Sequence, residues 1–288
     1  MKKSIILILS LILSVTMISC NNGGKEIEQK DKEYLIYPAN NYYENPLVLE
    51  NNEISNVKVS SEHKKFYLET SGPLERDSKA KDTYTYEIGT QKYILNFEET
   101  YKMGTKKLNK YQGEGRLYIE ADATTGKIAF LSTNADEESR QGSLSEEQAK
   151  KIAEETICGL YGSNVLKEYK HWKTTKVDKY SSYAIVYSKY VHGILTNDDI
   201  EILINMAGDI ECVNALYKGT LAGIEQEVSQ KDIEYALAAL KEFLGDTWTI
   251  DDFKQIVTDS EGDYYINAFI YRTVDGEPQS EQLYISLQ

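Results

Sequence analysis

Two stretches of the chain share one pattern, in which a capped amphipathic helix is followed by a pair of strands. The helices are predicted at 144–158 and 228–244, and their cap serines, Ser145 and Ser229, lie 84 positions apart. Each serine precedes a Gln or an Asp by three residues, which predicts a capping box. Apolar residues then recur at helical spacing, so each helix needs an apolar surface to cover.

The strand pairs repeat at nearly the same interval as the helices. Residues 190–204 (YVHGILTNDDIEILI) align without gaps on residues 273–287 (TVDGEPQSEQLYISL), so that Gly193 meets Gly276 at an offset of 83. Because two separate features share one offset, the pattern predicts an internal repeat. Residues 118–132 resemble the end of one further, more divergent copy.

A helix followed by antiparallel strands predicts an α+β fold. We expect tandem small units, each consisting of a helix packed on its own antiparallel sheet. The predicted units are a divergent strand-rich one at 47–142, a middle one at 143–222 and a truncated one at 223–288. Ile152 and Leu237 are expected in the helix cores, where a substituted Asp would unfold its unit because burying an unpaired charge is costly.

The letters ATTGK at 123–127 raise the question of a phosphate-binding loop. That motif requires a Gly five residues before Gly126 and a Ser or Thr after the Lys, whereas the chain has Ala121 and Ile128 at these positions. The flanking residues alternate as in strands, and Gly126 suits the positive φ of a tight turn. We therefore predict a turn between two strands.

The N-terminus predicts an export signal and a lipid anchor. Residues 1–19 combine two lysines with an apolar stretch too short to span a bilayer, and the following MISC resembles the lipobox of bacterial lipoproteins. This resemblance implies cleavage before Cys20, whose thiol would carry fatty chains and hold the protein on the extracytoplasmic face of the cell membrane. A plain secretory signal with a chance Cys is the alternative. Residues 20–46 are predicted as the lipidated N-terminus and tether, with 34–46 lying extended on the body.

Charge and cysteine content restrict the partners. The formal net charge is −14, which opposes binding to nucleic acid and to anionic lipid surfaces, so no nucleic acid partner is expected.

Apart from Cys20 the chain has Cys158 and Cys212, which could pair in an oxidising compartment or remain free in apolar surroundings. The sequence leaves that choice open.

The capped helix LSEEQAKKIA, the hairpin YVHG and the turn DATTGKI, taken together, resemble PepSY-type domains. These domains occur in metalloprotease propeptides and in bacterial surface proteins. The resemblance implies a PepSY-like, cystatin-like fold and a role in binding or restraining a peptidase, or in assisting its folding, and it supplies no catalytic residues. The chain departs from the pattern because VHGIL has no Pro after its Gly and no peptidase follows.

Motifs for catalysis are missing from the sequence. His63, His171 and His192 do not have the spacing of metal ligands, no G-x-S-x-G elbow occurs, and the acidic stretch 259–263 (DSEGD) does not match a calcium loop. We therefore predict no catalytic residue, metal or cofactor, and no enzyme. The predicted function is a lipid-anchored extracytoplasmic binding module that regulates or restrains a peptidase or contacts another envelope protein. The alternatives are a passive envelope scaffold and, with less support, an envelope hydrolase.

Overall fold

The computed structural model describes residues 32–39, 56–60, 62, 64–88, 91–133, 142–177 and 181–287. Predicted features at 1–19, Cys20 and His63, and most of the tether, lie outside the described residues. The compact unit considered below lies within Glu33–Gln288. In the part of the chain that the structure describes, no helix is both long enough and apolar enough to cross a membrane.

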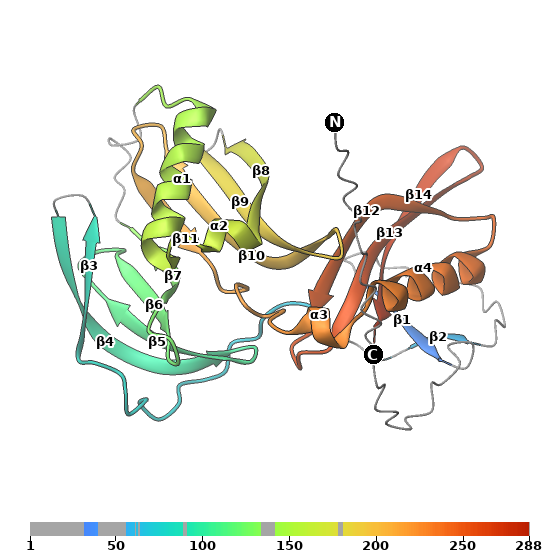
Figure 1. The fold of residues 1–288 in the computed structure, drawn as a ribbon, viewed down its shortest axis with the longest axis horizontal. Coiled ribbons are helices and arrows are strands. Elements are labelled where there is room, and N and C mark those ends of the chain that lie inside the picture. The colour runs from blue at the N-terminus through green and yellow to red at the C-terminus, as the bar shows by residue number, and fades with distance from the viewer. Residues whose placement is uncertain are drawn as a thin grey trace, which may run out of the picture. The chain divides into compact units, whose positions relative to one another are not determined.

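The described strands all belong to one mixed sheet (Figure 1). In chain order they are β1 (Tyr34–Pro38), β2 (Val57–Val59), β3 (Thr83–Ile88), β4 (Gln91–Met103), β5 (Lys106–Gln112), β6 (Tyr118–Asp122), β7 (Ile128–Ser132), β8 (Tyr169–Val177), β9 (Ser182–Val191), β10 (Ile194–Asn205), β11 (Ile210–Asn214), β12 (Thr249–Thr258), β13 (Tyr264–Val274) and β14 (Glu277–Ser286). The order across the sheet is β2-β1-β14-β13-β12-β10-β11-β7-β6-β5-β4-β3, with β9 and then β8 branching from β10.

This sheet corrects the predicted fold class. We expected each helix to cover a separate small sheet, and that prediction is wrong, because β10 pairs with β12 in parallel and β11 pairs with β7. The parallel junction joins Leu195 to Gln255 and Thr196 to Ile256. Alternating apolar residues determine which face of a strand is buried, but they do not determine which free edge the strand joins. The predicted unit boundaries stay predictions.

Strand β10 forms this junction because its two edges carry different partners. Along one edge β9 runs antiparallel to it from Ile194 to Asn205. Along the other edge β12 pairs with the first residues of β10 and β11 with its last residues. The register of the β9–β10 pair shifts between Leu195 and Asp199, which places a bulge beside the junction.

The two long helices begin where their caps predict. Helix α1 (Glu146–Tyr161) has Ser145 as N-cap and α4 (Gln230–Leu244) has Ser229, and both capping boxes are confirmed. Helices α2 (Val165–Glu168) and α3 (Ile224–Glu227) are single turns. The long helices cover different stretches of the sheet (Figure 1).

Each long helix contributes to its own hydrophobic core. Helix α1 packs with apolar residues of β6, β7, β9, β10 and β11, and α4 packs with β1, β12, β13 and β14. Ile157 and Leu240 are fully buried in these cores. Ile152 and Leu237, which we expected in the core, are only partly buried at its margin.

The predicted turns are confirmed. Asp122 Oδ1 accepts hydrogen bonds from the backbone N–H groups of Thr124 and Thr125, and Gly126 has φ of 68°, so ATTGK is a turn between β6 and β7. In the turns after β9 and β13, two consecutive residues have positive φ, namely His192-Gly193 and Asp275-Gly276. This is the backbone of a type I′ hairpin turn, which matches the twist of the strands.

A buried carboxylate fixes the connection that leads from β11 to α3. Asp198, in β10, accepts hydrogen bonds from the Tyr169 hydroxyl at 2.5 Å and from the Gly219 backbone N–H at 2.7 Å. Lys106 Nζ donates to the carbonyl oxygen of Leu216 at 2.6 Å in the same region. Burial lowers the pKa of this ammonium to about 8. These polar groups form hydrogen bonds with one another, so the role of the network is structural.

Candidate functional site

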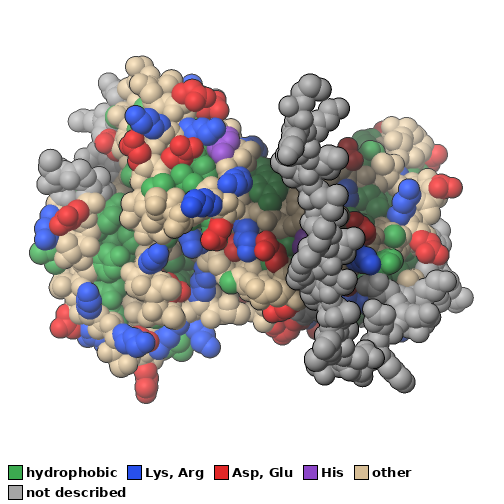
Figure 2. All heavy atoms as spheres, in the orientation of Figure 1, with side chains coloured by type: hydrophobic (Ala, Val, Ile, Leu, Met, Phe, Trp, Pro, Cys, Tyr) green, Lys and Arg blue, Asp and Glu red, His purple; other side chains and the backbone are tan. Residues whose placement is uncertain are grey.

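The surface mixes both signs of charge. Acidic and basic side chains are interspersed over the face drawn in Figure 2, without a large region of one sign. An interspersed surface of this kind does not mark a site by its charge, whereas a cavity lined by polar groups can.

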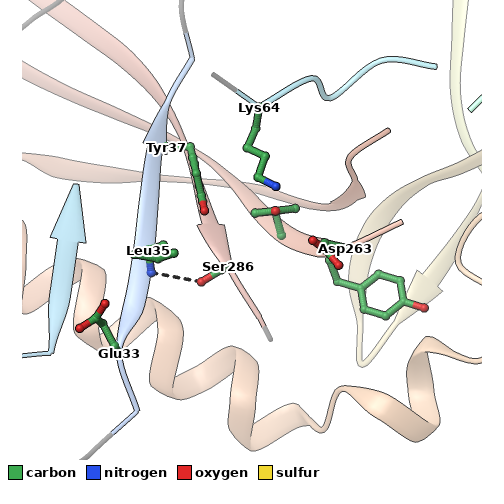
Figure 3. A pocket seen from close by; sticks show the side chains of 8 residues that line it. Glu33, Leu35, Tyr37, Lys64, Asp263 and Ser286 are labelled. Atoms are coloured by element: carbon green, nitrogen blue, oxygen red, sulfur yellow. Dashed lines mark hydrogen bonds between the residues drawn. The ribbon is translucent and has the colours of Figure 1, made fainter. Parts of the chain in front are cut away.

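A pocket of about 220 Å³ opens at one end of β1, β13 and β14 (Figure 3). Along β1 the residues alternate, so that Tyr34 and Ile36 join the core under α4 while Leu35 and Tyr37 face the other side of the sheet. The pocket lies on that other side. It is lined by Glu33, Leu35, Tyr37, Lys64, Asp263, Tyr264, Tyr265 and Ser286.

Asp259, in the turn between β12 and β13, contacts three of the residues that line the pocket. Its Oδ1 accepts hydrogen bonds from the backbone N–H groups of Glu261, Gly262 and Asp263 at 2.9, 2.9 and 3.0 Å. Its Oδ2 accepts a hydrogen bond from the Tyr265 hydroxyl at 3.1 Å. The Asp259 side chain is fully buried and its oxygens are occupied, so its role is to hold the turn.

Lys64 supplies the positive charge for this turn. Its Nζ lies 3.5 Å from Asp259 Oδ2 and 3.2 Å from Glu261 Oε2, with the Tyr37 ring centroid at 6.0 Å. Burial lowers the pKa of the ammonium, but the hydrogen bond to Glu261 and the charge of Asp259 raise it by more, so the net pKa is above its ordinary value. Lys64 is therefore held in its charged form.

Asp259, Glu261 and Asp263 each place one carboxylate oxygen within 4.8 Å of the others. Sequence reasoning described 259–263 only as solvated caps, and missed this convergence and the contact with Lys64. The available signal was the spacing of acidic residues at every second position. The ammonium of Lys64 already serves two of the three carboxylates as their cation.

Asp263 is the one of these three carboxylates that does not pair with Lys64. In the described part of the chain its oxygens have no hydrogen-bond or ion-pair partner. Burial and then the negative charge of Asp259 raise its pKa, against a smaller opposing effect of Lys64. Glu33, at the opposite end of the pocket in Figure 3, pairs with Lys58 at 2.5 Å. The pocket thus offers one carboxylate that would gain from an added cation.

The other candidate residues from the sequence do not join this pocket. His171 Nε2 lies 2.9 Å from Thr174 Oγ1, and His192 Nε2 lies 2.9 Å from the carbonyl oxygen of Val228. Cys158 and Cys212 are free cysteines, which settles the open choice between a bridge and two thiols. Burial raises the pKa of the Cys212 thiol to about 12, which makes it a poor nucleophile.

Comparisons with known proteins give two distant structural likenesses. No protein-family model and no curated protein matches the sequence. The chain is similar to the C-terminal domain of Bacillus megaterium YpeB, with 10% identity, a TM-score of 0.32, and coverage of 70% of this chain and 88% of that one. It also matches MucB, with 9% identity, a TM-score of 0.13, and coverage of 71% and 85%. TM-scores this low carry no argument about family or function.

Proposed function

We propose that this chain is a lipid-anchored extracytoplasmic binding protein that holds an envelope protein partner through a basic side chain seated beside Asp263. The partner class we favour is a peptidase, because the sequence resembles PepSY-type domains. Cys20 supplies the proposed anchor. The observation that carries the proposal is the Asp263 carboxylate, which lines a tyrosine-rich pocket and has no ion-pair partner among the described residues.

The pocket has the chemistry to recognise a lysine or arginine. Its volume of about 220 Å³ suits one long side chain, whose apolar stem would pack on Leu35 and the rings of Tyr37 and Tyr265. The charged end would form a charge-assisted hydrogen bond with Asp263. Displacing Lys64 is not required, because its bonds go to Asp259 and Glu261. The net charge of −14 would steer a basic partner toward the chain.

The test measures association and peptidase rate together. The soluble chain from Asn21 is added to purified envelope peptidases of its own organism, and both complex formation and cleavage rate are followed. Asp263→Asn is expected to weaken the complex by at least about tenfold, since a hydrogen bond to a charged group contributes roughly 1.5–3 kcal/mol. Asp275→Asn, at the exposed turn after β13, removes the same charge and is expected to leave binding unchanged.

Two outcomes would reject this function. The first is an unchanged cleavage rate with no complex at micromolar protein, which would favour the passive scaffold. The second is equal binding by Asp263→Asn and wild type, which would place the contact elsewhere on the chain. Added salt should weaken the wild-type complex more than the Asp263→Asn complex, because the variant complex has one ion pair fewer for salt to screen.

A further inference from the structure

Three aromatic side chains from distant parts of the sequence form a row at the surface. Trp172 of β8, Phe253 of β12 and Phe269 of β13 are each about two-fifths exposed, at 38%, 38% and 37%. The ring centroids are 6.4 Å apart between Trp172 and Phe253 and 6.1 Å apart between Phe253 and Phe269. Large apolar side chains grouped in this way on a surface mark an interaction site more often than single ones do. We call these three residues the aromatic row.

Two of the three rings are placed by β-bulges. Trp172 is the extra residue of β8, because His171 pairs with Tyr187 and Lys173 pairs with Val186, the neighbour of Tyr187 in β9. In β12 the register shifts between Ile250 and Lys254, so the stretch holding Phe253 is also bulged. A bulge redirects a side chain at the cost of ladder hydrogen bonds, and bulges are common beside binding sites. Both β8 and β12 therefore have a bulge in the stretch whose ring contributes to the row.

Amide side chains lie beside the row on the same face of the sheet. Gln255 is the direct cross-strand partner of Asn267, and Phe269 that of Gln282, so these side chains share a face. Gln282 Nε2 donates to Asn267 Oδ1 at 2.9 Å. Among the described residues, Asn267 Nδ2 and Gln282 Oε1 have no protein partner. The pair therefore leaves one donor and one acceptor unused, whichever way the amides are oriented, with Asn267 only 6% exposed and Gln282 half-buried beside the row.

We propose that the aromatic row and its amides bind a neutral glycan strand built of β-linked N-acetylhexosamine units. The apolar face of each pyranose ring would stack on an aromatic ring, and successive sugars would follow the row. An acetamido group offers one N–H donor and one carbonyl acceptor, which complement the free positions of Asn267 and Gln282. The acidic chain disfavours polyanionic polymers at this surface. This site is separate from the Asp263 pocket and does not rest on the function proposed above.

The first experiment uses the tryptophan of the row as the probe. The chain has two tryptophans, so Trp248→Phe leaves Trp172 as the reporter. The full chain in detergent is titrated with a hexamer of N-acetylglucosamine, and the emission of Trp172 and its quenching by acrylamide are recorded. We expect a saturable blue shift and protection from acrylamide. Cellohexaose has the same β-linked backbone without acetamido groups, and is expected to bind at least about tenfold more weakly.

The second experiment compares matched substitutions. Phe253→Ala removes the central ring of the row and is expected to weaken binding of the hexamer by about tenfold, the loss of one aromatic contact. Tyr235→Ala removes an aromatic ring that is 44% exposed on α4, and binding should stay within twofold of wild type. Unchanged urea midpoints show that both variants are folded. The titration of the Trp248→Phe chain tests the proposal without either of these variants.

Several results would overturn the proposal. These are no response of Trp172 to the hexamer, equal binding of the hexamer and cellohexaose, or equal binding by Phe253→Ala and wild type. Binding of a proline-rich peptide in place of the glycan would also overturn it and would assign the row to a protein ligand.

Discussion

Replacing Leu240 by Asp is expected to lower the free energy of unfolding by at least about 4 kcal/mol. The side chain of Leu240 is fully buried where α4 packs on the sheet. Loss of a buried Leu side chain costs roughly 2–5 kcal/mol, and burying a carboxyl group without a partner adds to this. Because domains are stable by about 5–15 kcal/mol, this loss removes a large share of the free energy of unfolding. The urea midpoint, followed by tryptophan fluorescence, is the measurement.

The control lies on the same helix. Ala238 is exposed, so Ala238→Asp introduces the same side chain into α4 without burying it. We expect this variant to lose no more than about 1 kcal/mol, the cost of a weaker helix former. If Leu240→Asp and Ala238→Asp unfold at similar urea concentrations, α4 does not cover the core that the structure assigns to it.

Asp199→Asn is expected to stabilise the chain at neutral pH by about 2–4 kcal/mol. Burial, followed by the charges of Glu201 and Asp198, raises the pKa of Asp199 from 3.8 to about 7. The folded state therefore binds this proton more tightly than the unfolded state does. The stability that the protonated Asp199 contributes is fully present below about pH 4 and is lost as the pH rises to about 7. An Asn keeps the neutral form at every pH and removes that loss.

The measurement is the difference in unfolding free energy between Asp199→Asn and wild type from pH 3.5 to pH 8. The difference should be near zero at the acid end and should grow up to about pH 7, above which it stays level. Asp275→Asn, at an exposed turn, controls for the loss of one negative charge. A difference that is constant across this range would contradict the raised pKa of Asp199.

Local features of the fold were predictable from the sequence. Ser145 and Ser229 begin their helices because a cap needs only the residues that follow it. The turns at Gly126, Gly193 and Gly276 follow from the freedom of glycine at positive φ. The extended N-terminal stretch is confirmed for β1, which pairs with β14. In each case the relevant contacts lie within a few residues or follow from strand alternation.

Contacts between remote residues were not predictable. The parallel pairing of Leu195 with Gln255 decides the fold class, and no pattern in either strand specifies it. Lys64 meets the acidic turn at Asp259 across nearly 200 positions, so the pocket could not be assembled from motifs. Trp172 and Phe253 read as ordinary strand residues, because bulges leave no reliable mark in a single sequence. The candidate site was therefore missed almost entirely.

The continuity of the sheet is the claim on which the aromatic row depends. Trp172 belongs to the strands attached to β9, whereas Phe253 and Phe269 belong to β12 and β13. These groups are joined through β10 and its parallel pairing with β12. If the junction were absent, the row could not form, and the chain would have the separate sheets that the predicted repeat implies.

A disulfide trap tests this junction directly. Leu195 and Gln255 are replaced by Cys in a chain that also carries Cys158→Ser and Cys212→Ser. Paired strands lie about 4.8 Å apart, within the roughly 4.4–6.8 Å between Cα atoms that a disulfide spans. We predict that mild oxidation links these two positions, as detected by mass spectrometry. The pair Leu195→Cys with Lys254→Cys should stay reduced, because position 254 faces the opposite side of the sheet. Two free thiols in the first pair, or equal oxidation of both pairs, would contradict a single continuous sheet.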